Sequence, residues 1–176
     1  GGESFLWSSE RTGYRHLYLV DTTTGEAGAL TAGDWPVSSV AAVDEDLGLV
    51  YFIAGQESPT EQHLFRQSLA TATPEAVQRI SRRSGWHQVT FDAGGRIYLD
   101  LYSNVDQPPQ LSLHSSDGER LGWLIENRID DDHPYALYAD DHRPTEFGVI
   151  AAEDGQSMHY RIITPPGFDG STQYPV

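Results

Sequence analysis

Three short segments, each with His or Gln followed by Leu, recur along the chain at one interval. They occupy residues 16–18 (His-Leu-Tyr), 63–65 (His-Leu-Phe) and 110–112 (Gln-Leu-Ser), each 47 residues after the last. A second set, Leu30-Thr31, Ile80-Ser81 and Leu124-Ile125, follows at offsets of 50 and 44, and Trp35 and Trp86 lie 51 apart. Strand-like repeats of about 40 to 50 residues are typical of propeller blades, which bury their faces by packing on neighbours. The pattern predicts stacked β-repeats with both tryptophans in the core.

Tight polar turns join the apolar runs. Four of them contain Asp together with Ser, Thr or Gly, at residues 21–25, 44–48, 92–95 and 115–118. Asp caps its own turn and Gly accepts a positive φ without a Cβ clash, so each turn is expected to close a β-hairpin. The acidic triplet Asp44-Glu45-Asp46 is therefore predicted to be an exposed hairpin tip rather than a grip for a cationic ligand.

The repeat stops near Asn127, which predicts three parts. Residues 1–127 are expected to form β-propeller blades, an incomplete set because 176 residues hold fewer than four units of 47 and a closed propeller has at least about four blades. Residues 128–144 are expected to form a connector with a short helix, capped by Asp130-Asp131-Asp132, ended by Pro144 and burying one face through Tyr135, Leu137 and Tyr138. Residues 145–176 are expected to form a hairpin around Glu153-Asp154-Gly155 and to begin a different domain.

Composition excludes several classes of partner. The net charge of -15 disfavours nucleic acid, because phosphate binding needs clustered Lys and Arg. There is no Cys, so neither a disulfide nor a thiolate metal site can form. No apolar run approaches the roughly eighteen residues that span a bilayer. The clusters Asp130–His133 and Asp140–His142 lack the alternating spacing of a calcium loop and are expected to be caps or solvated turns, so no metal or other cofactor is predicted.

No catalytic or substrate-binding residue can be assigned from the sequence. The strongest signature of a nucleophilic serine, Gly-x-Ser-x-Gly on a strand-to-helix turn, is absent. The chain has seven His and many Ser, but a triad is defined by geometry rather than by composition, so a chance arrangement is disfavoured.

The order of its short motifs gives the chain a resemblance to a known family. The motifs are residues 5–11 (FLWSSER), 13–18 (GYRHLY), 30–35 (LTAGDW), 50–52 (VYF), 58–61 (SPTE), 63–66 (HLFR), 98–103 (YLDLYS), 108–109 (PP), 124–127 (LIEN), 154–155 (DG), Met158, 160–161 (YR), 165–169 (PPGFD) and 174–176 (YPV). In this order and spacing the chain resembles dipeptidyl peptidase IV and its bacterial relatives, in the prolyl oligopeptidase clan of serine peptidases. The resemblance covers essentially the whole chain.

The resemblance implies an all-β fold made of the last blades of an eight-bladed propeller, then a short connector helix and a β-hairpin that opens an α/β-hydrolase domain. In the family, the glutamates that hold the substrate's free N-terminus lie upstream of this stretch. The oxyanion tyrosine and the catalytic Ser, Asp and His lie downstream. Asp44 and Glu45 fall in a different blade and do not replace the acidic clamp. The expected catalytic, substrate-binding, cofactor-binding and metal residues within this chain are therefore none.

Two functions remain open at this point. In the first, the parent protein removes Xaa-Pro or Xaa-Ala dipeptides from peptides with a free N-terminus, and this inactive segment walls and gates the cavity. In the second, the propeller is a binding module of a catalytically inactive relative. A part-propeller exposes blade faces and strand edges, so self-association of the isolated chain is expected. The resemblance to the family implies a homodimer of the parent protein. The family also suggests a periplasmic or otherwise exported location.

Overall fold

The computed structural model describes residues 3–70 and 73–174. The chain divides into two compact units, one made of the residues up to Asn104 together with Pro109–Glu126, the other of Val105–Pro108 together with the residues from Asn127 on. The first unit ends within one residue of the predicted end of the blades. The three-part division at 127 and 144 stays a prediction. No helix among the described residues is long and apolar enough to cross a bilayer.

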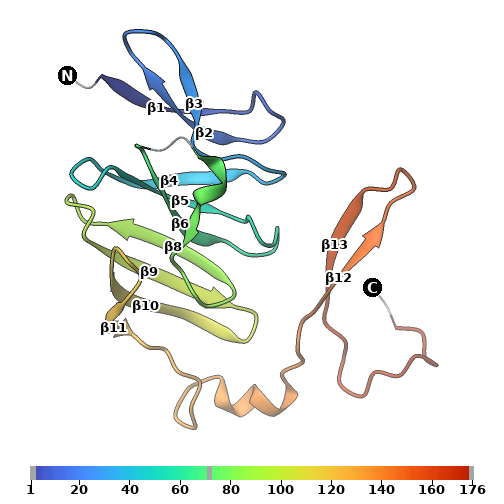
Figure 1. The fold of residues 1–176 in the computed structure, drawn as a ribbon. Coiled ribbons are helices and arrows are strands. Elements are labelled where there is room, and N and C mark those ends of the chain that lie inside the picture. Colours follow the sequence, from blue (N-terminus) through green and yellow to red (C-terminus); the bar gives the residue numbers. More distant parts are fainter. Residues whose placement is uncertain (1–2, 71–72, 175–176) are drawn as a thin grey trace. The chain divides into compact units, whose positions relative to one another are not determined.

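The first unit consists of three antiparallel sheets in chain order (Figure 1). The first sheet has the strand order β1-β2-β3, with β1 at Ser4–Ser9, β2 at His16–Asp21 and β3 at Ala27–Ala29. The second has the order β4-β5-β6-β7, with β4 at Val37–Asp44, β5 at Leu49–Ala54, β6 at His63–Ser68 and β7 at Gln78–Arg79; a short 3₁₀ turn, η1 (Pro74–Ala76), precedes β7. The third has the order β11-β10-β9-β8, with β8 at Trp86–Phe91, β9 at Ile97–Asn104, β10 at Gln107–Ser115 and β11 at Arg120–Ile125.

The sequence repeat is confirmed as a repeat of strands. The three recurring runs lie in β2, β6 and β10, and each of these is the last strand but one of its sheet. Consecutive antiparallel sheets of this kind, two with four strands and the first with three, match the blades of a propeller. The predicted turns also close hairpins, joining β2 to β3, β4 to β5, β8 to β9 and β10 to β11.

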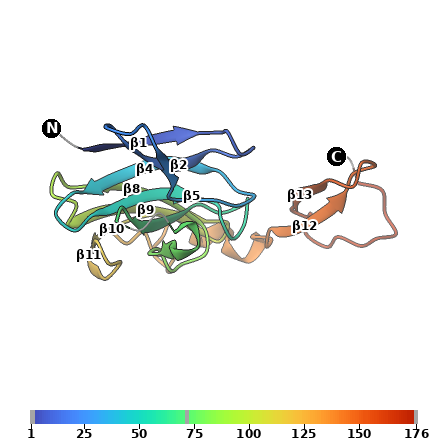
Figure 2. The same ribbon diagram turned by 45° about the horizontal axis from the view of Figure 1, so that its top comes forward.

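The second sheet lies between the other two and is buried on both faces (Figure 2). The central strand β5 consists of hydrophobic residues throughout, and its residues contribute to the cores on both faces of the sheet. Val50 and Phe52 belong to the core shared with Leu17 of the first sheet, whereas Tyr51 belongs to the core shared with Tyr98 of the third. Successive strand residues point to opposite faces, so a strand covered on both sides is apolar throughout.

The two tryptophans have different environments. Trp35 is 8% exposed and stacks on Phe52 at 6.4 Å between ring centroids, so its predicted core position is confirmed. The same prediction for Trp86 is wrong, because its side chain is 52% exposed. Trp86 alternates along β8 with His87, which is buried toward the second sheet, so its own side chain points away from that interface.

The second unit contains a 3₁₀ helix and one hairpin. The helix, η2 (Ala136–Asp141), begins later than its predicted acidic cap and ends before Pro144. The prediction that it buries one face is wrong, because Leu137 is 87% and Tyr138 61% exposed. A 3₁₀ helix of six residues, about two turns, stacks side chains three apart and has no broad apolar face to bury.

The hairpin of the second unit pairs β12 (Glu146–Ala151) with β13 (Ser157–Ile162) around the predicted turn. Its large apolar side chains are about half exposed: Phe147, Val149, Ile150, Met158, Tyr160 and Ile162. An isolated two-stranded hairpin is at best marginally stable in water. These faces are therefore suited to being covered by further structure.

Candidate functional site

A cluster of buried polar residues surrounds the start of β6, and it repeats an arrangement of the first sheet. At the start of β2, His16 Nδ1 lies 3.0 Å from the hydroxyl of Thr31, which also accepts the Leu17 N–H at 3.0 Å. At the start of β6, His63 Nδ1 lies 3.0 Å from Ser81 Oγ, which accepts the Leu64 N–H at 3.1 Å. The recurring sequence motifs therefore recur because they build the same hydrogen-bonded closure of each blade.

The backbone completes this closure in both sheets. The carbonyl oxygen of Leu17 accepts the N–H groups of Leu30 and Thr31, and the carbonyl oxygen of Leu64 accepts those of Ile80 and Ser81. In the third sheet Gln110 replaces the histidine, and its amide nitrogen donates to the carbonyl oxygen of Glu126. The closing segment of each blade is thus attached to its last strand but one.

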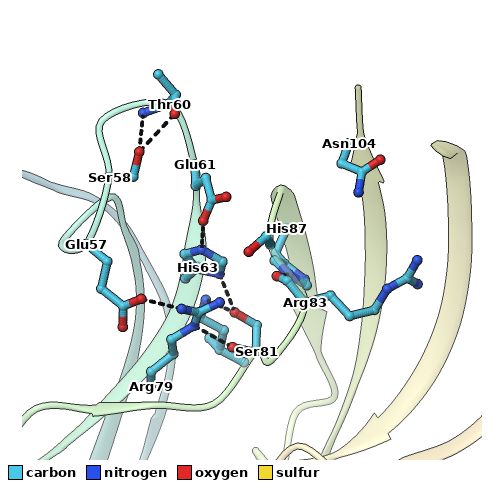
Figure 3. Close-up of polar contacts among 12 residues, drawn as sticks. Glu57, Ser58, Thr60, Glu61, His63, Arg79, Ser81, Arg83, His87 and Asn104 are labelled. Carbon is cyan, nitrogen blue, oxygen red and sulfur yellow. Dashed lines mark hydrogen bonds and ion pairs between the residues drawn. The ribbon is translucent and has the colours of Figure 1, made fainter. Parts of the chain in front are cut away.

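A hydroxyl, an imidazole and a carboxylate lie in line in this cluster, from Ser81, His63 and Glu61. These are the groups of a catalytic triad, but their surroundings differ from those of one. His63 Nε2 lies 2.7 Å from Glu61 Oε2 (Figure 3). Ser81 is only 5% exposed and His63 is fully buried, and the serine oxygen already accepts a backbone N–H. A nucleophile must be reachable by substrate and lie near donors for the oxyanion. The first sheet has the same arrangement with Thr31 and the Gly33 carbonyl, so the line is a structural repeat.

His87, at the start of β8, brings the third sheet to this cluster. Its Nδ1 lies 2.8 Å from Asp100 Oδ2 and its Nε2 lies 2.8 Å from the carbonyl oxygen of Arg83. His87 is 3% and Asp100 4% exposed. The Arg83 guanidinium lies 3.8 Å from the ring centroid of Tyr102 and donates to the side-chain oxygen of Gln110. These contacts lock β8, β9 and β10 to the segment that leads into the sheet.

The outer side of the cluster is formed by the loop before β6. Glu57 pairs with Arg79, whose Nε also donates to the Ser81 carbonyl oxygen at 2.7 Å. Ser58 and Thr60 share a hydrogen bond of 2.8 Å between their hydroxyls (Figure 3). The loop is therefore tied to itself and to the closing segment through its polar groups.

A cavity of about 500 Å³ adjoins His87 on the side of the third sheet. Its walls are formed by Ile80, Ser81, Arg82, Arg83, His87, Tyr98, Asp100, Tyr102, Ser112, His114, Asp117, Gly118, Glu119, Arg120 and Trp123. Burial lowers the pKa of His114 and raises the pKa of Tyr98 far above its usual value. The cavity therefore holds neutral rings beside charges of both signs, without an excess of one sign.

The acidic segments that the sequence offers as alternatives lie elsewhere. Asp44 ends β4 and accepts the Leu47 N–H at 2.9 Å, so the predicted hairpin turn is confirmed. Glu45 and Asp46 are exposed in it as predicted, but Asp44 is only 6% exposed, because its carboxylate turns back to cap the turn. In the second unit, His133 Nε2 lies 3.2 Å from Asn127 Oδ1, and His142 Nδ1 lies 2.7 Å from the Tyr135 hydroxyl. Within residues 3–70 and 73–174 no group of three or more His, Asp or Glu side chains is arranged to hold a metal ion.

The geometry of the cluster suits positioning rather than chemistry. Its hydroxyls and carboxylates are engaged in contacts that close blades or join them. In the sequence, the feature that pointed to this cluster was the repeated His-Leu motif, with Thr31 and Ser81 at matching positions. The His87–Asp100 contact was missed, although the turn at 92–95 sets a register that places His87 opposite Tyr102 and diagonal to Asp100.

Comparison with known proteins gives consistent matches. Residues 1–109 match the family model described as "Dipeptidyl peptidase IV (DPP IV) N-terminal region". A probable dipeptidyl-aminopeptidase B of Emericella nidulans is 34% identical over 99% of this chain and 19% of its own length. A probable dipeptidyl peptidase 4 of Aspergillus flavus is 27% identical over 96% of this chain and 21% of its own length.

The fold has a similar match among solved structures. The crystal structure of Porphyromonas gingivalis dipeptidyl peptidase 4 aligns with 98% of this chain and 24% of its own, with a TM-score of 0.83 and 26% identity. The chain spans about a fifth of the length of the curated relatives it matches.

Proposed function

Because the chain belongs to the dipeptidyl peptidase IV family, we propose that its parent protein is a serine exopeptidase that releases dipeptides from peptide N-termini, with Pro or Ala in second position. The observation that carries the proposal is the match of nearly the whole chain to a dipeptidyl peptidase 4 structure at a TM-score of 0.83. The relatives that match it in sequence are named as dipeptidyl peptidases as well.

In this proposal the segment frames the reaction and does not carry it out. Its buried hydroxyls, imidazoles and carboxylates are used to close and join blades, as in the pairs His16–Thr31 and His63–Ser81. A rigid wall around an active-site cavity limits which peptides enter and holds the reacting groups in place, and such positioning is a substantial part of catalysis. The net charge of -15 favours approach of a cationic peptide N-terminus.

The same proposal gives the second unit a role. Residues 145–176 would be the opening strands of an α/β-hydrolase domain that carries the nucleophile, its acid and its histidine. Support comes from the exposed apolar side chains on both strands of the β12–β13 hairpin, such as Phe147 and Ile162. A hairpin with apolar residues of this kind gains stability when it is packed into a larger sheet or domain.

The proposal also covers assembly and location. The exposed apolar residues of both units favour self-association of the isolated chain. On the family resemblance we infer a homodimer of the parent, which its sedimentation coefficient measures. Export to the periplasm or beyond is proposed on the family resemblance, and fractionation of cells that produce the parent tests it.

A chromogenic assay of the full-length parent tests the activity. Glycyl-prolyl-p-nitroanilide is expected to release p-nitroaniline, whereas its N-acetylated form is expected to stay intact because the free ammonium is missing. A folded parent that leaves both substrates intact would refute the proposal. A substituted serine in a Gly-x-Ser-x-Gly motif after Val176 would then identify the parent as a binding protein.

A further inference from the structure

Two buried imidazole rings meet where the second sheet joins the third. His63, at the start of β6, and His87, at the start of β8, have ring centroids 5.4 Å apart at an interplanar angle of 41° (Figure 3). His63 is fully buried and His87 is 3% exposed. Beside them two backbone hydrogen bonds cross the same seam, from Gln62 N–H to the Gly85 carbonyl oxygen and from His87 N–H to the Gln62 carbonyl oxygen.

The contacts of His87 fix a proton in this seam. Its Nε2 faces the carbonyl oxygen of Arg83 at 2.8 Å, and a carbonyl only accepts, so Nε2 carries hydrogen. Its Nδ1 faces Asp100 Oδ2 at 2.8 Å, so a second proton lies between these two atoms. Whichever atom holds that proton, His87 and Asp100 together are electrically neutral. The other oxygen of Asp100 has no hydrogen-bond partner among the described residues.

The contacts of His63 suit the neutral ring. Nε2–H donates to Glu61, and Nδ1 accepts from the Ser81 hydroxyl, whose oxygen accepts the Leu64 N–H. A further proton on Nδ1 would take away the acceptor of that hydroxyl. Burial lowers the pKa of His63; the hydrogen bond to Glu61 opposes this, and the charges of Arg79 and His87 lower the pKa further.

Charged and titratable groups of both sheets face the two rings. From the second sheet and the segments around it they are Glu57, Glu61, Arg79, Arg82 and Arg83, and from the third sheet Asp100 and His114. Glu57 is engaged by Arg79, and Arg83 by Gln110. Glu61 is the one carboxylate among these in contact with His63, so a charge on the ring would be compensated on one side only.

We propose that the His63–His87 contact is an acid-sensitive latch, which holds the second and third sheets together while His63 is neutral and lets this seam open when His63 takes up a proton. The direction of the pH dependence follows from the linkage between proton binding and stability. A base whose pKa is lowered in the folded state binds fewer protons folded than unfolded, so its contribution to stability is complete above the unfolded value of about 6.5 and is lost as the pH falls below it.

The seam between the first and second sheets is a matched control within the same molecule. There the Val37 N–H donates to the carbonyl oxygen of Arg15, the residue before His16, just as the His87 N–H donates to the residue before His63. The ring against His16 is Trp35, at 5.1 Å between centroids, and Trp35 does not titrate. Since His16 lies in the same hydroxyl closure as His63, the two seams differ in the second imidazole, and acid is expected to weaken the His63–His87 seam more than this one.

Hydrogen exchange of the full-length parent tests the latch without reference to its enzymatic activity. Amide protection at His87 and at Val37 is compared at about pH 7.5 and about pH 5.5, on either side of the ordinary histidine pKa, after division by intrinsic exchange rates. Protection at His87 is expected to fall at the lower pH by a factor of up to about ten, the limit that one histidine with an ordinary pKa of about 6.5 sets over this interval, and protection at Val37 is expected to fall less.

Two substitutions complete the test. His63→Gln keeps a donor for Glu61 and an acceptor for Ser81 but does not titrate, so it should remove the acid-specific loss at His87. His16→Gln, at the matched position, should leave that loss unchanged. Equal loss of protection at His87 and Val37, or an acid effect that persists in H63Q, would overturn the proposal. Should H63Q not fold, the comparison of the two amides in the unaltered protein decides alone.

Discussion

His16 and His63 each hold the closing segment of a blade through hydrogen bonds of the imidazole ring. This shared role explains why the His-Leu motif recurs in the sequence. Each ring bonds to a hydroxyl, Thr31 or Ser81, that also accepts the backbone N–H after the histidine. The third blade uses Gln110 and a backbone carbonyl for the same purpose. The hydrogen-bonded arrangement therefore repeats more closely than the amino-acid identities do, because different polar groups can satisfy the same buried atoms.

Removing one of these hydroxyls should destabilise the protein. Ser81→Ala leaves His63 Nδ1 and the Leu64 N–H without their partner in a buried place, and an unsatisfied buried group costs about 1–3 kcal/mol. We expect a loss of that size in the free energy of unfolding of the parent, measured by urea titration. The matched control is Ser8→Ala on the exposed strand β1, which should be neutral. Equal stability of S81A and S8A would contradict the structural role.

At the scale of elements, the sequence predicted what depends on local chemistry. Asp92 shows this: its Oδ1 accepts the N–H groups of Arg96 and Ile97 at 2.8 and 3.0 Å, as expected of a residue that caps its own turn. The burial of Trp86 and of the face of η2 was predicted wrongly. Burial depends on which surface comes to cover a residue, and strand or helix spacing does not contain that information.

The turn between β10 and β11 offers a test at this scale. Gly118 has a φ of +91°, and a Cβ there would lie 2.8 Å from the Ile80 carbonyl oxygen of the second sheet's closing segment. Gly25, with a φ of +73°, has nothing within 4 Å of a Cβ. Gly25→Ala should cost about 1–2 kcal/mol, the strain of a left-handed residue.

Gly118→Ala adds a clash to that strain. It should cost about 1–3 kcal/mol more than G25A, because the turn must move away from Ile80. The midpoints of urea unfolding of the two variants of the parent measure the difference. Equal midpoints would show that the contact between this turn and the second sheet does not contribute to stability.

At the scale of the molecule, the second sheet is the one with both faces covered. The third sheet packs on it through Tyr98 and leaves the opposite face open, where Leu101 is 41% and Ile125 55% exposed. In the first sheet Phe5 and Trp7 of β1 are 50% and 45% exposed. Exposed apolar residues of this kind are typical of surfaces that are covered in the complete protein. The three sheets therefore behave as consecutive blades of a longer ring.

A crystal structure of the full-length parent tests this account most directly. It is expected to show another blade packed over Leu101 and Ile125, a further strand paired with the free edge of β1, and the reacting serine outside residues 1–176. A parent in which the open face of the third sheet is in contact with solvent, or in which Ser81 faces bound substrate, would contradict it.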